Sequence, residues 1–331
     1  MFLPSSLPPF SNPPELYPMN LLIYPPLPPA ELAQVQAISE GMEIVNAQSE
    51  AEALAAIGEA EAMYGTLTPA LLARAAKLKW LQTPIAGLEH YMFPELAESP
   101  VVVSNMAKIY NDMIADHAMT YILMFARGFH VYFRRQMAGV WEEGAPVRHL
   151  ADCTLGIIGL GGIGTDLAQR GKAAQMRVIA VEARPRAKPD FVDELWPADR
   201  LPDLMAQSDF VVSCVPQTPA TVGLIGAAEI GLMKPSAFLI NISRGVVVKL
   251  DALVEALQTG RIAGAGLDVY EIEPLPAGHP LWRMENVILT PHVAAINPHV
   301  AQRRIDTLTA NLRRYLAGEP LRNVVDKKML F

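Results

Sequence analysis

The sequence is poor in the features that mark several classes of protein. Only two of its 331 residues are cysteines, Cys153 and Cys214, and both lie beside apolar, strand-like segments. We expect two reduced, buried thiols, as in a cytoplasmic protein, rather than a disulfide or a pair of metal ligands. No apolar run approaches the ~20 residues that a membrane-spanning helix needs. We therefore expect no metal site and no membrane segment.

Basic residues are not in excess either. Lys and Arg number 27 against 34 Asp and Glu, which gives a formal net charge of −7 at pH 7. Because nucleic acids and anionic membranes attract positive surfaces, this balance disfavours both as partners. The chain is 51% hydrophobic and 18% charged, so it can form large apolar cores, and its length predicts roughly two domains.

The N-terminal segment differs in composition from the rest. Residues 1–18 are rich in proline and lack the basic and continuous apolar regions of a signal peptide. We expect this leader to be poorly ordered. Met19 directly precedes the first strand-like run, so Met1 and Met19 both stay open as the start of translation.

The most informative stretch runs from Cys153 to Glu182. An apolar run over residues 155–158 predicts a buried parallel strand, and it leads into the glycine-rich motif GLGGIG at 159–164 and a helical pattern to about residue 175. A second apolar run ends on Glu182, roughly 20 residues after the motif. This strand–turn–helix–strand context predicts a dinucleotide-binding Rossmann unit, which the glycines alone would not.

Each glycine has a physical task in such a unit. Gly159 lets the chain turn sharply off the strand, Gly161 lets the backbone approach a pyrophosphate, and Gly164 lets the helix pack closely on the strand. The first turn of the helix offers unpaired N–H groups and a partial positive charge to phosphates.

The choice between NAD and NADP depends on the end of the second strand. Glu182 can accept hydrogen bonds from the ribose hydroxyls and repels a 2′-phosphate, which favours NAD. Arg184 and Arg186 follow in the loop and could accommodate that phosphate, so NADP stays open.

The chain before this unit alternates short apolar runs with helical patterns. Strands are expected at residues 21–24, 62–65, 80–83 and 101–104, and helices at 29–39, 50–57 and 69–76, the last with Thr68 as N-cap. This alternation predicts a small, doubly wound parallel sheet. The loop at residues 83–87 follows a strand end, where open α/β sheets bind ligands.

The remaining pattern suggests how the domains are connected. A helical pattern over 110–129, with His117 at a core spacing, predicts a long linking helix. Later strands are expected at 210–215, 238–242, 265–269 and 287–289, and a helix at 251–258 with Asp251 as N-cap and Gly260 as its stop. A last helix, 298–316, is expected to pack on the first domain. The predicted domains are 19–108 plus 298–331, and 109–297.

Three polar residues follow expected strands in the second domain. Arg244 stands where an arginine can bind a carboxylate bidentately and still contact a neighbouring carbonyl. An imidazole titrates near neutral pH, so His292 suits proton transfer. Glu273, if it lies beside that imidazole, orients it and favours its protonated form. Each residue alone could be structural or solvated, but the combination indicates an active site.

From Met19 onward the chain resembles the D-isomer-specific 2-hydroxyacid dehydrogenase family, which includes glyoxylate/hydroxypyruvate reductases and phosphoglycerate dehydrogenases. The resemblance rests on GLGGIG at 159–164, NISRG at 241–245, GLDVYEIEPLP at 266–276, HPLW at 279–282 and TPHVA at 290–294. It implies an α/β protein of two doubly wound parallel-sheet domains, a Rossmann NAD(P)-binding domain and a smaller flavodoxin-like substrate domain, with the active site in the cleft. It also implies a homodimer.

The family pattern implies a role for each matching position. His292 corresponds to the general acid/base, Glu273 to its partner, and Arg244 to the group that binds the substrate carboxylate and polarises the keto oxygen. Backbone amides at Ala86 and Gly87 correspond to a second site for that carboxylate. The cofactor-binding positions are Gly159, Gly161, Gly162, Ile163, Gly164, Glu182, Arg184, Val215, Pro216, Thr221, Ser243, Asp268 and His292, with Asp268 near the nicotinamide carboxamide.

The implied activity is reversible hydride transfer between nicotinamide and a 2-keto acid or D-2-hydroxy acid. Glyoxylate, hydroxypyruvate, pyruvate and bulkier 2-keto acids all stay open as substrates. An alternative from another class is an NAD(H)-sensing binding protein, similar to the co-repressors of this superfamily, with little turnover. The complete set of Arg244, Glu273 and His292 favours an enzyme.

Overall fold

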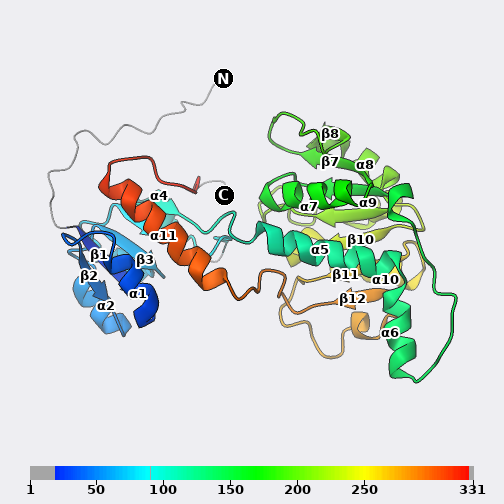
Figure 1. Cartoon of the computed structure of the whole chain (residues 1–331), viewed down its shortest axis with the longest axis horizontal. Helices are drawn as coiled ribbons and strands as arrows, with labels where there is room; N and C mark the ends of the chain where they lie inside the picture. The colour runs from blue at the N-terminus through cyan, green and yellow to red at the C-terminus, as the bar shows by residue number, and fades with distance from the viewer. Residues whose placement is uncertain (1–18, 90, 328–331) are drawn as a thin grey trace. The chain divides into compact units, whose positions relative to one another are not determined.

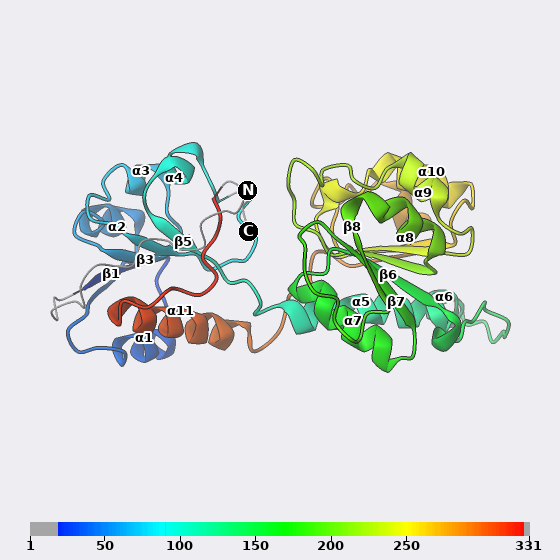
Figure 2. The ribbon, with the colours of Figure 1, turned by 90° about the horizontal axis from the view of Figure 1, so that it is seen from above.

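The computed structural model describes residues 19–89 and 91–327, so the leader at 1–18 lies outside the described residues. Two compact units are present. The first contains the residues up to Ile109 together with those from Pro298, and the second is Tyr110–Asn297. Each unit is built around one parallel β-sheet with helices on both faces (Figures 1 and 2). This architecture confirms the predicted fold class.

The sheet of the first unit has the strand order β2-β1-β3-β4-β5, which is the order of flavodoxin-like folds. The second strand in sequence, with the residues EIVN, was not predicted. It pairs with one neighbour only and its side chains are exposed or half-buried, so it lacks the apolar run of an interior strand. The strands are β1 (Asn20–Tyr24), β2 (Glu43–Asn46), β3 (Ala62–Gly65), β4 (Trp80–Gln82) and β5 (Val102–Ser104).

Helices cover both faces of this sheet. Figure 2 shows α1 (Pro29–Gln36) beside α11 (Val300–Leu316) on one face. The other face carries α2 (Glu50–Ala56), α3 (Pro69–Leu72) and α4 (Pro94–Glu98), which pack over a core that includes Leu71 and Leu96. The predicted N-cap of α3 is confirmed, because the side chain of Thr68 accepts a hydrogen bond from the backbone N–H of Leu71.

The C-terminal helix contributes buried groups to the first unit. Asn311 on α11 is fully buried, and its Nδ2 donates to Gln82 Oε1 on β4 at 2.8 Å. Tyr315 stacks on Trp80 with 5.3 Å between the ring centroids. A buried amide without a partner is costly, so these contacts fix α11 against the sheet.

The sheet of the second unit has seven parallel strands in the order β12-β11-β10-β9-β6-β7-β8, a Rossmann order extended by one strand. Because all pairs are parallel, the carboxyl ends of the strands lie along one edge, which we call the carboxyl edge. The strands are β6 (Thr154–Ile158), β7 (Arg177–Glu182), β8 (Glu194–Pro197), β9 (Phe210–Ser213), β10 (Phe238–Asn241), β11 (Gly264–Leu267) and β12 (Val287–Leu289).

Two apolar cores hold the helices of this unit on the sheet. One core lies under α5 (Asn111–Ala126) and α7 (Gly162–Ala173), and the other under α8 (Leu201–Gln207), α9 (Ala227–Leu232) and α10 (Leu250–Gln258) (Figure 2). The short 3-10 helices are η1 (Leu150–Asp152), η2 (Ala198–Arg200), η3 (Gly245–Val247) and η4 (Pro280–Arg283).

Two local predictions in the second unit are wrong. The long helix does not continue to residue 129, because Gly128 adopts a left-handed conformation with φ 69° and the chain restarts as α6 (Phe129–Met137). Asp251 is not an N-cap, since α10 begins one residue earlier at the buried Leu250 and Asp251 lies in its first turn. Its carboxylate there still faces the positive end of the helix dipole.

Both cysteines are free thiols, and burial raises the pKa of Cys214 to about 12. Among the described helices, none has both the length and the apolar composition that crossing a membrane requires.

Candidate active site

The glycine-rich turn joins β6 to α7 at the carboxyl edge. Gly159 has φ +90°, and a Cβ there would lie 2.8 Å from Val215 Cγ1. A Cβ at Gly164 would lie 2.2 Å from the carbonyl oxygen of Gly159, so this position needs glycine for the close helix–strand packing that was predicted. A Cβ at Gly161, by contrast, meets no described heavy atom within 4 Å. Packing therefore does not require Gly161, and the open approach to the first turn of α7 fits the pyrophosphate of an NAD(P) group.

Other predicted cofactor residues surround this turn. A Cβ at Gly162 would lie 2.1 Å from Asn111 Nδ2, so the start of α5 packs on the start of α7. Thr221 Oγ1 donates to the carbonyl of Pro216 at 2.6 Å and accepts from the N–H of Thr218 at 2.8 Å. These bonds fold the loop after β9 back on itself. Val215 of this loop lies beside Gly159. This position is consistent with the prediction that Val215 and Pro216 line the adenine pocket.

The acid at the end of β7 faces the same turn. Glu182 Oε2 accepts from the backbone N–H of Leu160 at 2.9 Å, and Oε1 accepts from that of Arg184 at 3.1 Å. The guanidinium of Arg186 donates to the carbonyl of Leu160. The carboxylate and one of the two predicted phosphate-binding arginines are therefore both fixed beside the glycine turn.

The imidazole and carboxylate that were predicted to cooperate do form a pair. His292 Nδ1 lies 2.8 Å from Glu273 Oε2, and Glu273 Oε1 accepts from the backbone N–H of Tyr270 at 2.9 Å. The side chains are 49% and 35% exposed, so the pair remains accessible from solvent. His292 itself has φ 54°, a left-handed conformation that is uncommon for a histidine. Such backbone strain of about 1–3 kcal/mol persists only where the surroundings enforce it.

The loop of Arg244 lies against the loop that carries Glu273. A Cβ at Gly245 would lie only 1.9 Å from the carbonyl carbon of Tyr270, so the two backbones touch at this glycine. Arg244 is half-buried; its Nη1 donates to the carbonyl of Ser243 at 2.8 Å, and Asn241 Nδ2 donates to the carbonyl of Arg244 at 3.0 Å. The structure thus brings Arg244, Glu273 and His292 to one part of the carboxyl edge.

Two predicted cofactor residues are buried hydrogen-bonding groups. Ser243 Oγ donates to Asn241 Oδ1 at 2.7 Å and lies 2.9 Å from Ser213 Oγ, which joins the ends of β9 and β10. Asp268 is 1% exposed, and its carboxylate accepts from the backbone N–H groups of Val293 and Ala294. Both carboxylate oxygens are therefore engaged within the protein, and contact of Asp268 with a carboxamide stays a prediction.

Sequence reasoning missed the residues that support Asp268. Thr290 Oγ1 donates to Asp268 Oδ1 at 2.5 Å, and His117 and Tyr121 of α5 both reach the same hydroxyl. Thr290 is the first residue of the TPHVA motif and directly follows β12. This place in the motif is the one sequence signal that could have identified it. His117 sits at an apolar spacing, which is typical of a core residue.

Ala86 and Gly87 belong to the first unit and the other site residues to the second. Their loop follows β4, and its carbonyl groups are bonded: Thr83 Oγ1 donates to the carbonyl of Ile85 at 3.1 Å, and Asn105 Nδ2 donates to that of Ala86 at 2.7 Å. Fixing the carbonyls orients the peptide planes, which is what a site of backbone amide donors requires.

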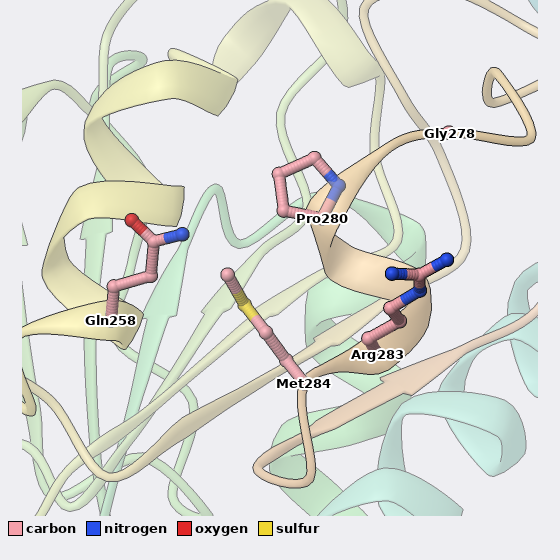
Figure 3. A pocket seen from close by; sticks show the side chains of 5 residues that line it. All are labelled: Gln258, Gly278, Pro280, Arg283 and Met284. Carbon is pink, nitrogen blue, oxygen red and sulfur yellow. The ribbon is translucent and has the colours of Figure 1, made fainter.

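A pocket of about 440 Å³ lies elsewhere on the second unit, between the end of α10 and η4 (Figure 3). Gln258 enters it from α10, and Pro280, Arg283 and Met284 line it from η4 and the residue after it. It contains none of the predicted site residues, so we do not place the chemistry there.

Comparison with known proteins identifies the family. Residues 119–294 match the family model of the D-isomer specific 2-hydroxyacid dehydrogenase NAD binding domain. The chain is 32% identical over 299 residues to glyoxylate/hydroxypyruvate reductase B of Yersinia enterocolitica, covering 86% of this chain and 90% of that one. It is 34% identical over 270 residues to glyoxylate reductase of Thermococcus litoralis, covering 78% of this chain and 80% of that one.

A solved structure is similar over most of the chain. The crystal structure of a D-isomer specific 2-hydroxyacid dehydrogenase from Xanthobacter autotrophicus Py2, in complex with NADPH and MES, superposes with a TM-score of 0.82 at 29% identity, covering 95% of this chain and all of that one. The chain therefore belongs to the D-isomer-specific 2-hydroxyacid dehydrogenase family, as an NAD(P)-dependent oxidoreductase that acts on CH–OH groups.

Proposed function

We propose that this protein reduces a small 2-keto acid to the D-2-hydroxy acid, with His292 and Glu273 as the acid/base pair and Arg244 as the carboxylate and carbonyl binder. The observation that carries the proposal is the 2.8 Å contact between His292 Nδ1 and Glu273 Oε2, at the carboxyl edge and beside the loop of Arg244. Two glyoxylate reductase relatives make glyoxylate and hydroxypyruvate the first substrates to test.

The chemistry of the site follows from its charges. When bound, the nicotinamide group supplies or accepts the hydride. Glu273 holds Nδ1 of His292, so Nε2 is the atom that gives a proton to the keto oxygen, or takes it from the alcohol. The guanidinium of Arg244 can bind the substrate carboxylate with its two-pronged donor geometry and stabilise the negative charge that develops on the oxygen. The N–H groups of Ala86 and Gly87 are proposed to bind the same carboxylate.

The direct test is the oxidation of NADH and NADPH, measured in parallel against a panel of 2-keto acids that includes glyoxylate, hydroxypyruvate and pyruvate. Rapid turnover of one pair supports the proposal and identifies substrate and cofactor together. Tight cofactor binding without turnover of any member supports the NAD(H)-sensing alternative instead. Failure to bind either cofactor contradicts the assignment of the glycine turn.

For the cofactor we propose a preference for NADH that depends on Glu182. Its carboxylate is held by the N–H groups of Leu160 and Arg184, close to where the Rossmann pattern places the adenosine ribose. A 2′-phosphate would meet a fixed negative charge there. The opposing observations are the neighbouring Arg184 and Arg186, and the NADPH bound to the Xanthobacter relative.

Glu182→Gln is therefore expected to raise the ratio of NADPH to NADH affinity by about tenfold, which corresponds to ~1.4 kcal/mol. The glutamine keeps the side-chain length and removes the charge. The measurement is the Kd of each cofactor by nucleotide fluorescence, in the absence of substrate. Arg184→Gln is the matched control and should change the ratio in the opposite direction. An unchanged ratio in Glu182→Gln would show that this carboxylate does not select the cofactor.

We further propose a homodimer formed by a segment of the second unit, residues 129–147, which we call the arm. Figures 1 and 2 both show the arm projecting from the end of α5. It is anchored at two points. Arg134 within the arm donates to the carbonyls of Met284 and Glu285, and the residue after the arm, Arg148, donates to that of Ser236. Six large apolar side chains of the arm are nevertheless exposed: Phe129, Phe133, Met137, Val140, Trp141 and Val147.

We propose a second copy of the chain as the partner of this surface, in line with the homodimer that the family resemblance implies. Trp141 is 98% exposed and Met137 is 87% exposed, although aromatic residues and Met are enriched in interface cores and disfavoured in water. A segment that is already ordered loses little conformational entropy on binding, so an arm anchored at Arg134 and Arg148 is suited to a permanent interface.

Trp141→Ala is expected to weaken self-association by about 30-fold or more, the effect of losing a tryptophan hot spot of ~2 kcal/mol. Sedimentation velocity across a concentration series measures the dimer dissociation constant. Trp282→Ala removes a tryptophan that is 52% exposed and lies outside the arm, so it should leave association unchanged. A wild-type protein that stays monomeric at micromolar concentration would contradict the dimer.

A further inference from the structure

Four side chains behind the catalytic pair form one connected hydrogen-bond network. The hydroxyl of Thr290 is its centre, at 2.5 Å from Asp268 Oδ1, 2.5 Å from the Tyr121 hydroxyl and 2.9 Å from His117 Nε2. His117 and Tyr121 lie one turn apart on α5 and contact each other edge to face. The network therefore ties α5 to the ends of β11 and β12.

The direction of each hydrogen bond follows from the groups themselves. An ionised carboxylate only accepts, so Thr290 must donate its single proton to Asp268. The Thr290 oxygen then has only acceptor capacity left, and both partners on α5 must donate to it. His117 consequently carries a proton on Nε2, and Tyr121 donates its hydroxyl proton.

The other side of Asp268 holds the segment that carries His292. Asp268 Oδ1 accepts from the N–H of Val293 at 2.9 Å, Oδ2 accepts from that of Ala294 at 3.0 Å, and the backbone carbonyl of Asp268 accepts from the N–H of His292 at 2.8 Å. Three consecutive amides are thus fixed by one residue. They surround the left-handed backbone of His292, which needs such support to persist.

We propose that Thr290, held by His117 and Tyr121, is a positioning residue for the catalytic histidine: it fixes the Asp268 carboxylate, which in turn fixes the strained backbone of His292 beside Glu273. This inference rests on the proposed function for the role of His292. Thr290, His117 and Tyr121 act through Asp268 and do not contact the reacting atoms.

The charges around His117 are consistent with this role. Burial lowers the pKa of His117, and the Asp268 carboxylate, 3.7 Å from Nε2, opposes that shift. Burial also raises the pKa values of Tyr121 and Tyr270, so both phenols stay protonated and Tyr121 remains a donor. Arg170 of α7 is paired with Asp116 rather than directed to this network. A neutral imidazole with its proton on Nε2 is therefore compatible with neutral pH.

The test compares Thr290→Val, which keeps the shape and removes the hydroxyl, with Thr290→Ser, which keeps the hydroxyl. We expect Thr290→Val to lower kcat by about 10- to 100-fold, the effect of a misplacement near 1 Å, with the KM for cofactor changed less than about threefold. Thr290→Ser should restore kcat to within about threefold of wild type. On α5, His117→Leu removes the donor and should lower kcat, whereas His117→Gln keeps an N–H and should recover part of it.

A measurement without cofactor or substrate separates positioning from turnover. The downfield proton resonance of the imidazole N–H shared by His292 and Glu273 is assigned by its loss in Glu273→Gln. We expect it to be retained in Thr290→Ser and broadened or shifted in Thr290→Val. Thermal unfolding of each variant shows that the protein assayed is folded.

The outcomes distinguish the positioning role of Thr290 from the proposed function of the enzyme. A wild-type enzyme that turns over keto acids, with Thr290→Val unchanged in both kcat and the imidazole resonance, overturns the positioning role alone. Absence of turnover in the wild type overturns the proposed function and, with it, a catalytic role for the network. Equal loss of kcat in Thr290→Val and Thr290→Ser contradicts the hydroxyl-based mechanism.

Discussion

His292→Asn is expected to lower kcat for keto-acid reduction by about 10³-fold, within the range that a general acid contributes. Asparagine is the matched replacement, because it tolerates the left-handed conformation that His292 adopts at φ 54°. The variant therefore keeps the backbone of the loop and loses the titrating group. Steady-state kinetics over a range of pH gives kcat, and nucleotide fluorescence gives the Kd of NADH.

The cofactor affinity separates a chemical role from a structural one. We expect the Kd of NADH to change less than about threefold in His292→Asn, since the other predicted cofactor contacts, at the glycine turn and Glu182, are unaltered. Glu273→Gln should fall between this variant and wild type, at about 10- to 100-fold in kcat, because the imidazole stays but loses its charged partner. Equal losses of kcat and cofactor affinity in His292→Asn would argue against an acid/base role.

Arg244→Gln is expected to lower kcat/KM for the keto acid by about 10³-fold, or ~4 kcal/mol of transition-state stabilisation. In the proposed mechanism the guanidinium binds the substrate carboxylate and stabilises the negative charge on the neighbouring oxygen. Glutamine is uncharged and can do neither as well. The loss should be visible both as a higher KM and as a lower kcat.

Arg244→Lys tests geometry separately from charge. Lysine keeps the charge but not the planar two-pronged donor. We therefore expect kcat/KM of Arg244→Lys to be only about tenfold higher than that of Arg244→Gln. The neighbouring Asn241 and Ser243 hold the loop through backbone and side-chain bonds that neither variant removes. Recovery by lysine to wild-type activity would mean that only the charge matters. Undiminished activity in Arg244→Gln would remove this residue from the site.

Most of the fold followed from local sequence patterns. The strand 155–158, the glycine turn and the acid at Glu182 were predicted correctly, because hydrophobic period, glycine conformation and strand ends are local properties. The missed elements include several without such a local signal. The edge strand β2 buries little, β8 is another edge strand with half-exposed residues, and α6 is separated from α5 only by Arg127 and the left-handed Gly128.

The site divides in the same way. The residue types at Arg244, Glu273 and His292, and the order of their motifs, came from the sequence. Their proximity did not, because it depends on parallel strands bringing distant loops to one edge, on the backbone contact at Gly245 and on the pairing of Nδ1 with Oε2. The conformation of His292 and the support of Asp268 by Thr290 were likewise invisible in the chain.

The sequence by itself thus determined the two doubly wound sheets, the dinucleotide-binding turn and the three residues on which the chemistry is proposed to depend. Each of these is written in a short stretch whose spacing has a direct physical meaning. The tertiary structure alone decided that His117, an expected core residue, donates to Thr290 and that one buried carboxylate fixes three amides around His292. Hydrogen bonds between residues far apart in the chain have no period and no fixed spacing, so only the folded protein reveals them.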